Sequence, residues 1–222
     1  REEIKLSETK IKNSINDKVV LVTGAAGSIG SGLVKQIANF NPKLVILFDQ
    51  AESALYDLQW DLKEVAPELN YDIVIGDVTH KMRVHNLIRS FNPHIIFHAA
   101  AYKHVPLMEL NPSEAVKTNV LGTKILADIS IEFNVEKFIF ISTDKAVNPT
   151  NVMGATKRAS EIYVQYKNAS SNTQFITTRF GNVLGSNGSV IPLFQKQIEN
   201  GGPITITDER INRFFMSIPE AC

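Results

Sequence analysis

Short apolar runs alternate along this chain with longer segments in which apolar and polar residues are mixed. The runs are nearly continuous and rich in Val, Ile and Phe, which is typical of strands buried on both faces of a parallel sheet. They cover residues 19–22, 44–48, 73–75, 94–98, 138–141 and 175–178. Strands that alternate with helices in this way predict an α/β protein with a Rossmann-type doubly wound parallel sheet.

The segments between the runs have helical length and spacing. In one of them Ile29, Leu33 and Ile37 recur four residues apart, which places them on one helical face. The predicted helices cover residues 28–40, 53–65, 79–91, 113–133 and 152–169, and a further one lies near 192–200.

The pattern divides the chain into three segments. Residues 1–17 are polar and lack a clear period, so we expect a linker or leader there. Residues 18–179 carry the alternation and form the predicted NAD(P)-binding Rossmann domain. From residue 180 to 222 the sequence turns rich in Gly, Asn and Ser, which indicates the start of a small, apparently truncated C-terminal substrate-binding region.

Charge and cysteine content exclude several classes of protein. The 222 residues include 23 basic and 23 acidic side chains, whereas a nucleic-acid surface normally shows a basic excess. The single cysteine, Cys222, permits no disulfide framework and fits a reducing compartment such as the cytoplasm. No stretch approaches the roughly 20 apolar residues of a membrane helix, and the charged start does not resemble a secretory signal.

A glycine-rich loop follows the first predicted strand directly. It reads Thr23-Gly24-Ala25-Ala26-Gly27-Ser28-Ile29-Gly30. Gly24 permits a tight turn, Gly27 lets the backbone approach a pyrophosphate, and Gly30 lets the helix pack on the strand. The helix N-terminus then offers amide donors to an anion, so this loop predicts a dinucleotide site.

Asp49 ends the second predicted strand and favours NAD over NADP. Its carboxylate suits the adenosine ribose and repels a 2′-phosphate, and Gln50-Ala51-Glu52 offer no Arg to hold that phosphate. Asp77, which follows the third strand beside Val78, is placed to accept from the adenine amino group. Either aspartate could instead cap the helix that follows it.

Several longer motifs resemble the extended short-chain dehydrogenases/reductases. They are residues 24–30, 76–78, 98–101 and 119–123. The run Ser142-Thr143-Asp144-Lys145-Ala146-Val147-Asn148-Pro149 and its continuation to Arg158 is narrower: it is similar to bacterial UDP-N-acetylglucosamine 4,6-dehydratases of capsule and glycan biosynthesis. Residues 179–186 and 213–220 match the same family. The resemblance covers about residue 15 to the end.

The resemblance implies a lyase that oxidises C4 of the sugar, eliminates water across C5 and C6, and returns the hydride to C6. Asp144 would be the acid of the elimination, with its pKa raised by burial, and Lys145 the base. Thr143 would bind the C4 oxygen, and Lys157 the ribose of the nicotinamide. Cofactor contacts implied in the same way include Thr23, Ala26, Ser28, Ile29, Val78, Ala99, Ala100, Ala101 and Asn119.

Met153 departs from the usual family pattern, in which a tyrosine stands four residues before the lysine. A thioether cannot accept the proton of the C4 hydroxyl. The chain is therefore either a cofactor-binding module without activity or similar to the larger membrane-anchored subgroup, which has Met here. We favour the subgroup because Asp144 and Lys145 are retained, and expect Asp144 to deprotonate the C4 hydroxyl, directly or through water. The configuration at C5 stays open.

The substrate contacts implied by the resemblance are Lys103, Asn182, Ser189, Val190, Pro192 and Arg213. The expected substrate is a UDP-N-acetylhexosamine. A parent protein of this subgroup is anchored in the bacterial inner membrane through a preceding region and presents this domain to the cytoplasm. Copies of the chain could associate into a homo-oligomer through the helices at 113–133 and 152–169.

Two alternatives remain beside the dehydratase, a UDP-sugar 4-epimerase and a non-catalytic NAD-binding module. Neither needs an acid and a base at Asp144 and Lys145. A metal site is not expected, because His94 and His98 share a face of one strand but no Cys or acidic pair completes a ligand set.

Overall fold

Six parallel strands form the central sheet of the protein. The computed structural model describes residues 8–186, 188–206, 208–210 and 212–222. The strands are β1 (Val19–Thr23), β2 (Leu44–Asp49), β3 (Tyr71–Ile75), β4 (Ile95–His98), β5 (Lys137–Thr143) and β6 (Gln174–Phe180). Their order is β3-β2-β1-β4-β5-β6, with every neighbouring pair parallel, so the predicted doubly wound Rossmann sheet is confirmed.

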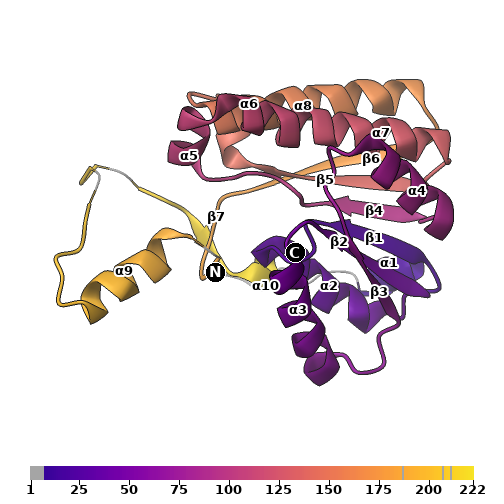
Figure 1. Ribbon diagram of the computed structural model, residues 1–222, viewed down its shortest axis with the longest axis horizontal. Coiled ribbons are helices and arrows are strands. Elements are labelled where there is room, and N and C mark those ends of the chain that lie inside the picture. Colours follow the sequence, from indigo (N-terminus) through magenta and orange to yellow (C-terminus); the bar gives the residue numbers. More distant parts are fainter. Residues whose placement is uncertain (1–7, 187, 207, 211) are drawn as a thin grey trace.

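Helices cover both faces of the sheet (Figure 1). One layer contains α2 (Ser28–Ile37) and α3 (Glu52–Val65), and the other contains α4 (Lys81–Phe91), α7 (Thr123–Glu132) and α8 (Val152–Ser170). Two separate apolar cores result. In β1, Leu21 packs into the core under the α4–α7–α8 layer, while Val20 and Val22 pack into the core under α2 and α3, because side chains alternate along a strand.

The N-terminal segment contains a helix that the sequence did not predict. Within the expected leader, residues 8–15 form α1 (Glu8–Ile15), while residues 1–7 lie outside the described part. Ile11 and Ile15 stand four apart and pack against the α2–α3 core, with Ile15 7% exposed. Two isoleucines are too few to stand out as a helical period among the polar residues around them.

The predicted helix at 113–133 forms as one continuous stretch that widens into a π segment, and a further helix precedes it. The chain forms α5 (Val105–Leu110), α6 (Pro112–Ala115), a π-helix over Val116–Gly122 and then α7. In the π-helix the carbonyl oxygen of Asn119 accepts hydrogen bonds from two hydroxyls, Thr123 Oγ1 at 2.6 Å and Ser160 Oγ at 2.7 Å. These side chains compete with the regular helical ladder, which is why the turn widens.

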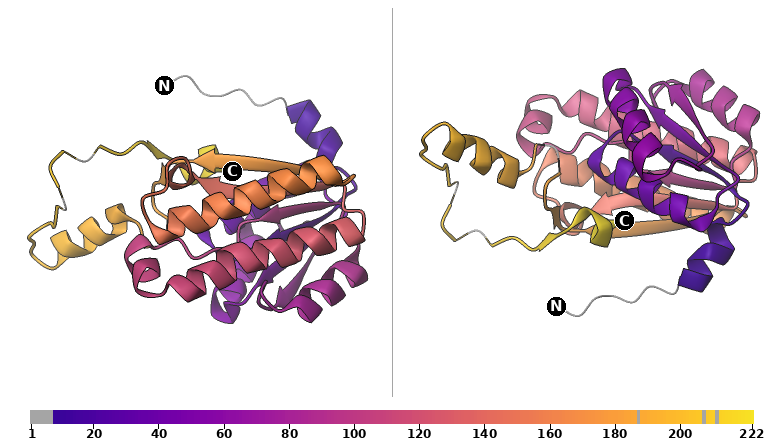
Figure 2. Two further views of the ribbon diagram at one scale, coloured as in Figure 1. Left: turned by 90° about the horizontal axis from the view of Figure 1, so that it is seen from above. Right: turned by 90° about the horizontal axis from the view of Figure 1, so that it is seen from below.

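The C-terminal segment leaves the sheet at the carboxyl ends of its strands. There β7 (Asn182–Val183) pairs in parallel with β8 (Phe215–Met216), and α9 (Val190–Glu199) projects from the body in all views (Figures 1 and 2). The last helix, α10 (Ile218–Ala221), returns to α2, where Gln36 Nε2 donates to the Pro219 carbonyl at 2.9 Å. Throughout the described ranges no helix has the length and apolar character to cross a bilayer.

Phe138 offers a test of the core. It is fully buried near the start of β5, and its ring centroid lies 5.1 Å from that of Phe175 and 5.8 Å from that of His98. Phe138→Ala should lower the free energy of unfolding by about 3–5 kcal/mol, because it leaves a cavity among rigid neighbours. Urea denaturation followed by circular dichroism measures this. Ile162→Ala, at a side chain that is 54% exposed, should change stability little, and equal losses in both variants would contradict the packing described.

Candidate active site

The glycine-rich loop joins β1 to α2 at the point where strand order reverses. Gly24 has φ of +68°, and a Cβ there would lie 2.5 Å from the backbone nitrogen of Ala100. A Cβ on Gly30 would collide with the carbonyl oxygen of Gly24. Only glycine satisfies both positions, and the loop they shape exposes backbone amides beside the N-terminus of α2. This cradle fits a dinucleotide pyrophosphate.

A small cavity of about 250 Å³ lies beside the loop, between the ends of β2, β3 and β4. The predicted cofactor residues that line it are Gly24, Ala26, Gly27, Asp49, Asp77, Val78, Ala99, Ala100 and Ala101. An adenosine-sized pocket next to a phosphate loop is the expected arrangement for a dinucleotide. Asp49 ends β2 and Asp77 follows β3, and both reach this cavity because the carboxyl ends of the two parallel strands lie at the same edge of the sheet.

Asp49 and Asp77 do not cap the helices that follow them. Asp49 accepts from the Ala26 amide in the glycine-rich loop and from the Ala51 amide, both at 3.0 Å, and no side chain caps α3. Asp77 accepts from the Thr79 amide at 2.8 Å, whereas His80 caps α4. Asp49 therefore joins the end of β2 to the phosphate loop, and its carboxylate stays on the wall of the small cavity.

A larger cleft of about 730 Å³ opens at the carboxyl ends of β4 and β5. It collects most of the residues predicted for catalysis and substrate binding: Ile29, Lys103, Thr143, Lys145, Met153, Lys157, Asn182, Ser189, Val190 and Arg213. Residues that are far apart in the sequence thus meet in one space. Of the other predicted residues, those that line neither cavity are Thr23, Ser28, Gly30, Asn119, Asp144 and Pro192.

Thr143, Asp144 and Lys145 form a hydrogen-bonded turn where β5 ends. Thr143 Oγ1 donates to Asp144 Oδ1 at 2.9 Å, and Lys145 Nζ donates to the same oxygen at 3.1 Å. Lys145 Nζ also donates to Asn182 Oδ1 at 3.2 Å, which links the turn to β7. A short 3₁₀-helix over Asp144–Ala146 holds the acidic and basic side chains together.

The electrostatics of Asp144 differ from the expectation that burial raises its pKa. Partial burial does favour the neutral form, but the hydrogen bonds from Thr143 and Lys145 and the charge of Lys145 outweigh it, so the pKa of Asp144 is lowered. Half of its side chain is exposed, which leaves the carboxylate solvated. Asp144 is therefore an ionised group before substrate arrives and is suited to accept a proton first.

Lys157 lies at the inner wall of the cleft on α8. It is 5% exposed, its Nζ donates to the Ile141 carbonyl at 2.6 Å, and Nζ lies 4.1 Å from the centre of the Phe140 ring. Burial lowers the pKa of Lys157 to about 7, while the charge of Glu161 opposes this shift. One turn earlier Met153 is 4% exposed and packs against Met108, so it lines the cleft without offering a proton acceptor.

A buried histidine joins the phosphate loop to the π-helix. His98 Nδ1 lies 2.7 Å from Thr23 Oγ1, and Nε2 lies 2.9 Å from Thr123 Oγ1. Since the Thr123 hydroxyl donates to the Asn119 carbonyl, Nε2 donates to Thr123 and Nδ1 accepts from Thr23. Burial, and secondarily the charge of Lys157, lowers the pKa of His98 to about 3. His98 is thus neutral and structural.

Asn119 acts through Tyr102 rather than at a cavity wall. The side chain of Asn119 accepts from the Tyr102 amide at 2.9 Å and donates to the Tyr102 carbonyl at 3.0 Å. Tyr102 lines both cavities, and the sequence did not predict it as a site residue. In the sequence, Tyr102 could have been identified as a site residue only from its position directly after Ala99–Ala101, in the loop that follows β4.

Comparisons with known proteins match this chain over most of its length. The family model described as "Polysaccharide biosynthesis protein" matches residues 20–222. The capsular polysaccharide biosynthesis protein CapD of Staphylococcus aureus is 49% identical over the whole chain, which spans 37% of that relative. The inverting UDP-N-acetylglucosamine 4,6-dehydratase of Campylobacter jejuni is 40% identical over 92% of the chain and 61% of its own length.

A solved structure and a relative of different activity complete the comparison. The crystal structure of Pen from Bacillus thuringiensis superposes with a TM-score of 0.86 and 39% identity over 93% of this chain and 63% of that one. The UDP-glucose 4-epimerase of Rickettsia rickettsii is 37% identical over 92% of the chain and 60% of its length. The chain thus spans between about a third and two thirds of the relatives it matches.

The buried His98 predicts a dependence of stability on pH. Its folded pKa of about 3 lies below its ordinary value of 6.5, so between these values the unfolded chain binds more protons. The free energy of unfolding should therefore fall as pH decreases from 6.5, by up to about 1.4 kcal/mol per pH unit from this group. His98→Asn should show a smaller slope between pH 5 and 6.5 in urea denaturation. Equal slopes in both proteins would contradict a neutral buried His98.

Proposed function

We propose that this chain, which belongs to the polysaccharide biosynthesis protein family of extended short-chain dehydrogenases/reductases, is the catalytic part of a nucleotide-sugar 4,6-dehydratase. Its substrate would be UDP-N-acetylglucosamine, and its product a UDP-4-keto-6-deoxy-N-acetylhexosamine for bacterial polysaccharide or glycan synthesis. The dehydratase relative at 40% identity supports this reaction.

The observation that carries the proposal is the turn at the end of β5. An elimination needs an acid and a base beside one sugar ring, and Asp144 and Lys145 provide both within 3.1 Å of each other. Thr143 and Lys145 face the large cleft, whose inner wall holds Lys157. A fold that only binds a dinucleotide has no use for this pair.

The ionised state of Asp144 gives the order of proton transfers. Asp144 takes the proton of the C4 hydroxyl, either directly or through water, while Thr143 donates a hydrogen bond to the C4 oxygen. Lys145, once its ammonium group has released a proton to solvent, removes the proton on C5, which the C4 ketone has made acidic, and returns a proton to C5 when the hydride returns to C6. Asp144 returns its proton to the departing C6 hydroxyl, which leaves as water. Asp144 is thus first a base and then an acid, so no tyrosine is needed at Met153.

The dinucleotide cradle would hold NAD, whose nicotinamide supplies the chemistry of hydride acceptance from C4 and return to C6. Gly24, Gly27 and the N-terminus of α2 would bind the pyrophosphate, and Asp49 the adenosine ribose. Lys157, with its Nζ held at the Ile141 carbonyl, would hold the ribose next to the nicotinamide. Tyr102, placed by Asn119, would separate the two cavities.

The outer part of the cleft would bind the UDP moiety. Asn182 is already hydrogen-bonded to Lys145, and Ser189, Val190 and Arg213 line the same space. Arg213 would contribute its planar fork to a phosphate. Pro192, in the first turns of α9, would act by shaping that helix. Anchoring of a longer parent protein in the inner membrane and association of copies both remain predictions.

The second candidate function is a UDP-sugar 4-epimerase, which the Rickettsia relative favours. An epimerase also oxidises C4 but returns the hydride to C4 and eliminates nothing. The pair Asp144 and Lys145 favours the dehydratase. A cofactor-binding module without catalysis would leave this pair without a role.

The first experiment incubates the protein with UDP-N-acetylglucosamine and follows the nucleotide sugar by mass spectrometry. We expect the loss of one water without net consumption of added NAD. Asp144→Asn and Lys145→Ala should each lower the rate by about 10²-fold or more while NAD still binds, because each removes a proton-transfer group. Asp61→Asn, an exposed carboxylate paired with Lys35, is the control and should leave the rate unchanged.

Other outcomes separate the rival functions. A product of unchanged mass that NMR identifies as the C4 epimer would replace the dehydratase with an epimerase. Binding of NAD without conversion of the sugar, in a longer form of the protein as well, would leave the non-catalytic module. Full activity in Asp144→Asn would refute the assigned order of proton transfers.

Asp49 predicts the choice between the two nicotinamide cofactors. The carboxylate on the wall of the small cavity should repel a 2′-phosphate, so the protein should bind NAD more tightly than NADP. Asp49→Asn should narrow this difference by about tenfold, since it removes one charge contact of roughly 1–2 kcal/mol. Isothermal titration calorimetry with both cofactors measures the ratio. Asp77→Asn, on the same cavity, is the matched control, and an unchanged ratio in Asp49→Asn would contradict the assignment.

A further inference from the structure

Glu161 is a buried carboxylate that the proposed reaction does not use. It lies on α8, one turn after Lys157 and two turns after Met153, and its side chain is 3% exposed. It also lies outside the large cleft, so it does not touch a substrate there. A buried charge costs folding free energy unless it is fully paired, so the role of Glu161 depends on its partners.

Four hydrogen bonds saturate the Glu161 carboxylate. Oε1 accepts from Ser142 Oγ at 2.6 Å and from Arg179 Nε at 2.7 Å. Oε2 accepts from Arg179 Nη2 at 2.5 Å and from Arg158 Nη1 at 3.1 Å. Burial favours the neutral form, but these bonds and the charge of Arg179 lower the pKa of Glu161 to about 2. The carboxylate is therefore charged at neutral pH and well into the acid range.

These partners tie α8 to the strand that leads into the reactive turn. Ser142 directly precedes Thr143 and is paired in register with Arg179 on β6. One residue earlier, the Ile141 carbonyl accepts from Lys157 Nζ. Two consecutive residues of β5 are thus fixed to α8, one through Lys157 and the next through Glu161.

Glu161 also acts on Lys157 through charge. The two side chains lie at positions i and i+4 of α8 and therefore on one face. Burial lowers the pKa of Lys157, and the charge of the Glu161 carboxylate opposes this shift. Arg158 and Arg179, which donate to Glu161, offset part of the negative charge that the carboxylate presents to Lys157.

We propose that Glu161 is a positioning residue: its carboxylate stabilises the ammonium form of Lys157 and holds Ser142, and with it the Thr143–Lys145 turn, in register with α8. The inference rests on the proposed function, in which the ammonium group of Lys157 binds the ribose of the nicotinamide cofactor. A charged Lys157 has three N–H donors, of which one is directed to Ile141, so the others can serve the ligand.

The other ionisable groups around Lys157 do not replace Glu161. His98, on β4, feels the charge of Lys157 but is neutral, with a pKa of about 3. Lys103, Lys145 and Arg213 share the cleft, but as basic side chains they offer Lys157 no negative charge. Asp208, the acidic side chain of the cleft wall, is hydrogen-bonded to Arg210.

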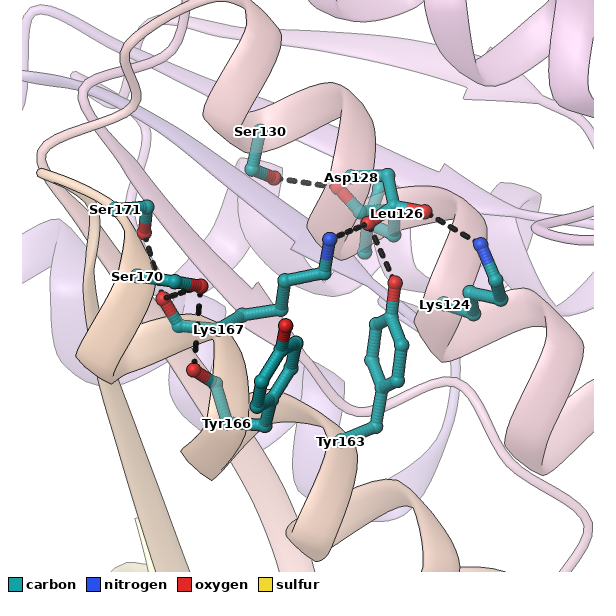
Figure 3. A network of polar contacts seen from close by, with 9 residues as sticks. All are labelled: Lys124, Leu126, Asp128, Ser130, Tyr163, Tyr166, Lys167, Ser170 and Ser171. Carbon is teal, nitrogen blue, oxygen red and sulfur yellow. Dashed lines mark hydrogen bonds and ion pairs between the residues drawn. The ribbon is translucent and has the colours of Figure 1, made fainter.

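A matched carboxylate exists on the neighbouring helix. Asp128 on α7 accepts from Lys124 at 2.6 Å, from the Tyr163 hydroxyl at 2.6 Å and from Lys167 at 2.8 Å, and Figure 3 shows it between these groups. Its pKa, like that of Glu161, is lowered to about 2 by such contacts against the effect of burial. Asp128 also ties a helix to α8, but it does not contact β5. Asp128→Asn therefore controls for the general loss of an ion-pair cluster.

The test measures the titration of Lys157 itself, by ¹³Cε NMR of the whole chain without cofactor, and then the affinity for NADH between pH 5.5 and 9. We expect the wild-type affinity to fall as Lys157 loses its proton near pH 7. In Glu161→Gln both midpoints should move to lower pH by roughly one unit or more, because a nearby opposite charge is lost. Glu161→Asp should keep the wild-type midpoint, and Lys157→Met should abolish the pH dependence of binding.

Several outcomes would overturn the inference. One is a weaker affinity at every pH with unchanged midpoints in Glu161→Gln, because that is the result of a purely structural role. Another is the same midpoint shift in Asp128→Asn, and a third is a pH dependence that survives in Lys157→Met. If Glu161→Gln does not fold, Arg158→Gln tests the opposite direction: removing a cation that offsets the Glu161 carboxylate should move the Lys157 midpoint to higher pH, and an unchanged midpoint refutes the inference.

This design separates the inference from the proposed function. The NMR titration needs neither cofactor nor sugar, so failure of the protein to dehydrate UDP-N-acetylglucosamine leaves the result for Glu161 intact. Conversely, if the protein dehydrates the sugar but Lys157 titrates identically in wild type and Glu161→Gln, the proposed function stands and the inference about Glu161 is refuted.

Discussion

The contact between Gly24 and the backbone of Ala99 and Ala100 is the constraint on which the site depends. It occurs where β1 and β4 diverge, and it leaves no room for a Cβ at Gly24. The loop that follows β4 continues from this contact, and its residues Ala99, Ala101 and Tyr102 line both cavities. The dinucleotide cradle and the large cleft therefore lie next to each other and share the loop that follows β4.

Much of this arrangement could be predicted from the sequence, because it follows from local patterns. The six apolar runs specified the strands, and the glycine spacing specified the loop, since both depend on backbone sterics and burial. The resemblance brought the residues of the turn after β5 and of α8 to one site, where the structure places Thr143, Lys145, Met153 and Lys157 along the same cleft.

What the sequence could not show depends on contacts between distant residues. The lowered pKa of Asp144 results from the way Thr143 and Lys145 point at it, which no spacing reveals. Asn119 was predicted to contact cofactor, whereas its amide is fully used in holding Tyr102 and Thr156. The helix α1 was not predicted because Ile15, which is buried, and Ile11, which is partly buried, are recognisable as core residues only once the α2–α3 core is known.

The π-helix at Val116–Gly122 has a consequence for how this region can change in length. A π turn contains one residue more than an α turn covering the same rise, so shortening the segment by one residue would restore a regular α-helix. Because one turn would replace another, the helix on either side would keep its faces, and Thr123 would stay opposite His98. What would be lost is the widened turn in which the Asn119 carbonyl accepts from the Thr123 and Ser160 hydroxyls. A single-residue gap at this place in an alignment would thus mark the loss of a local link to α8 rather than a shift of the whole helix.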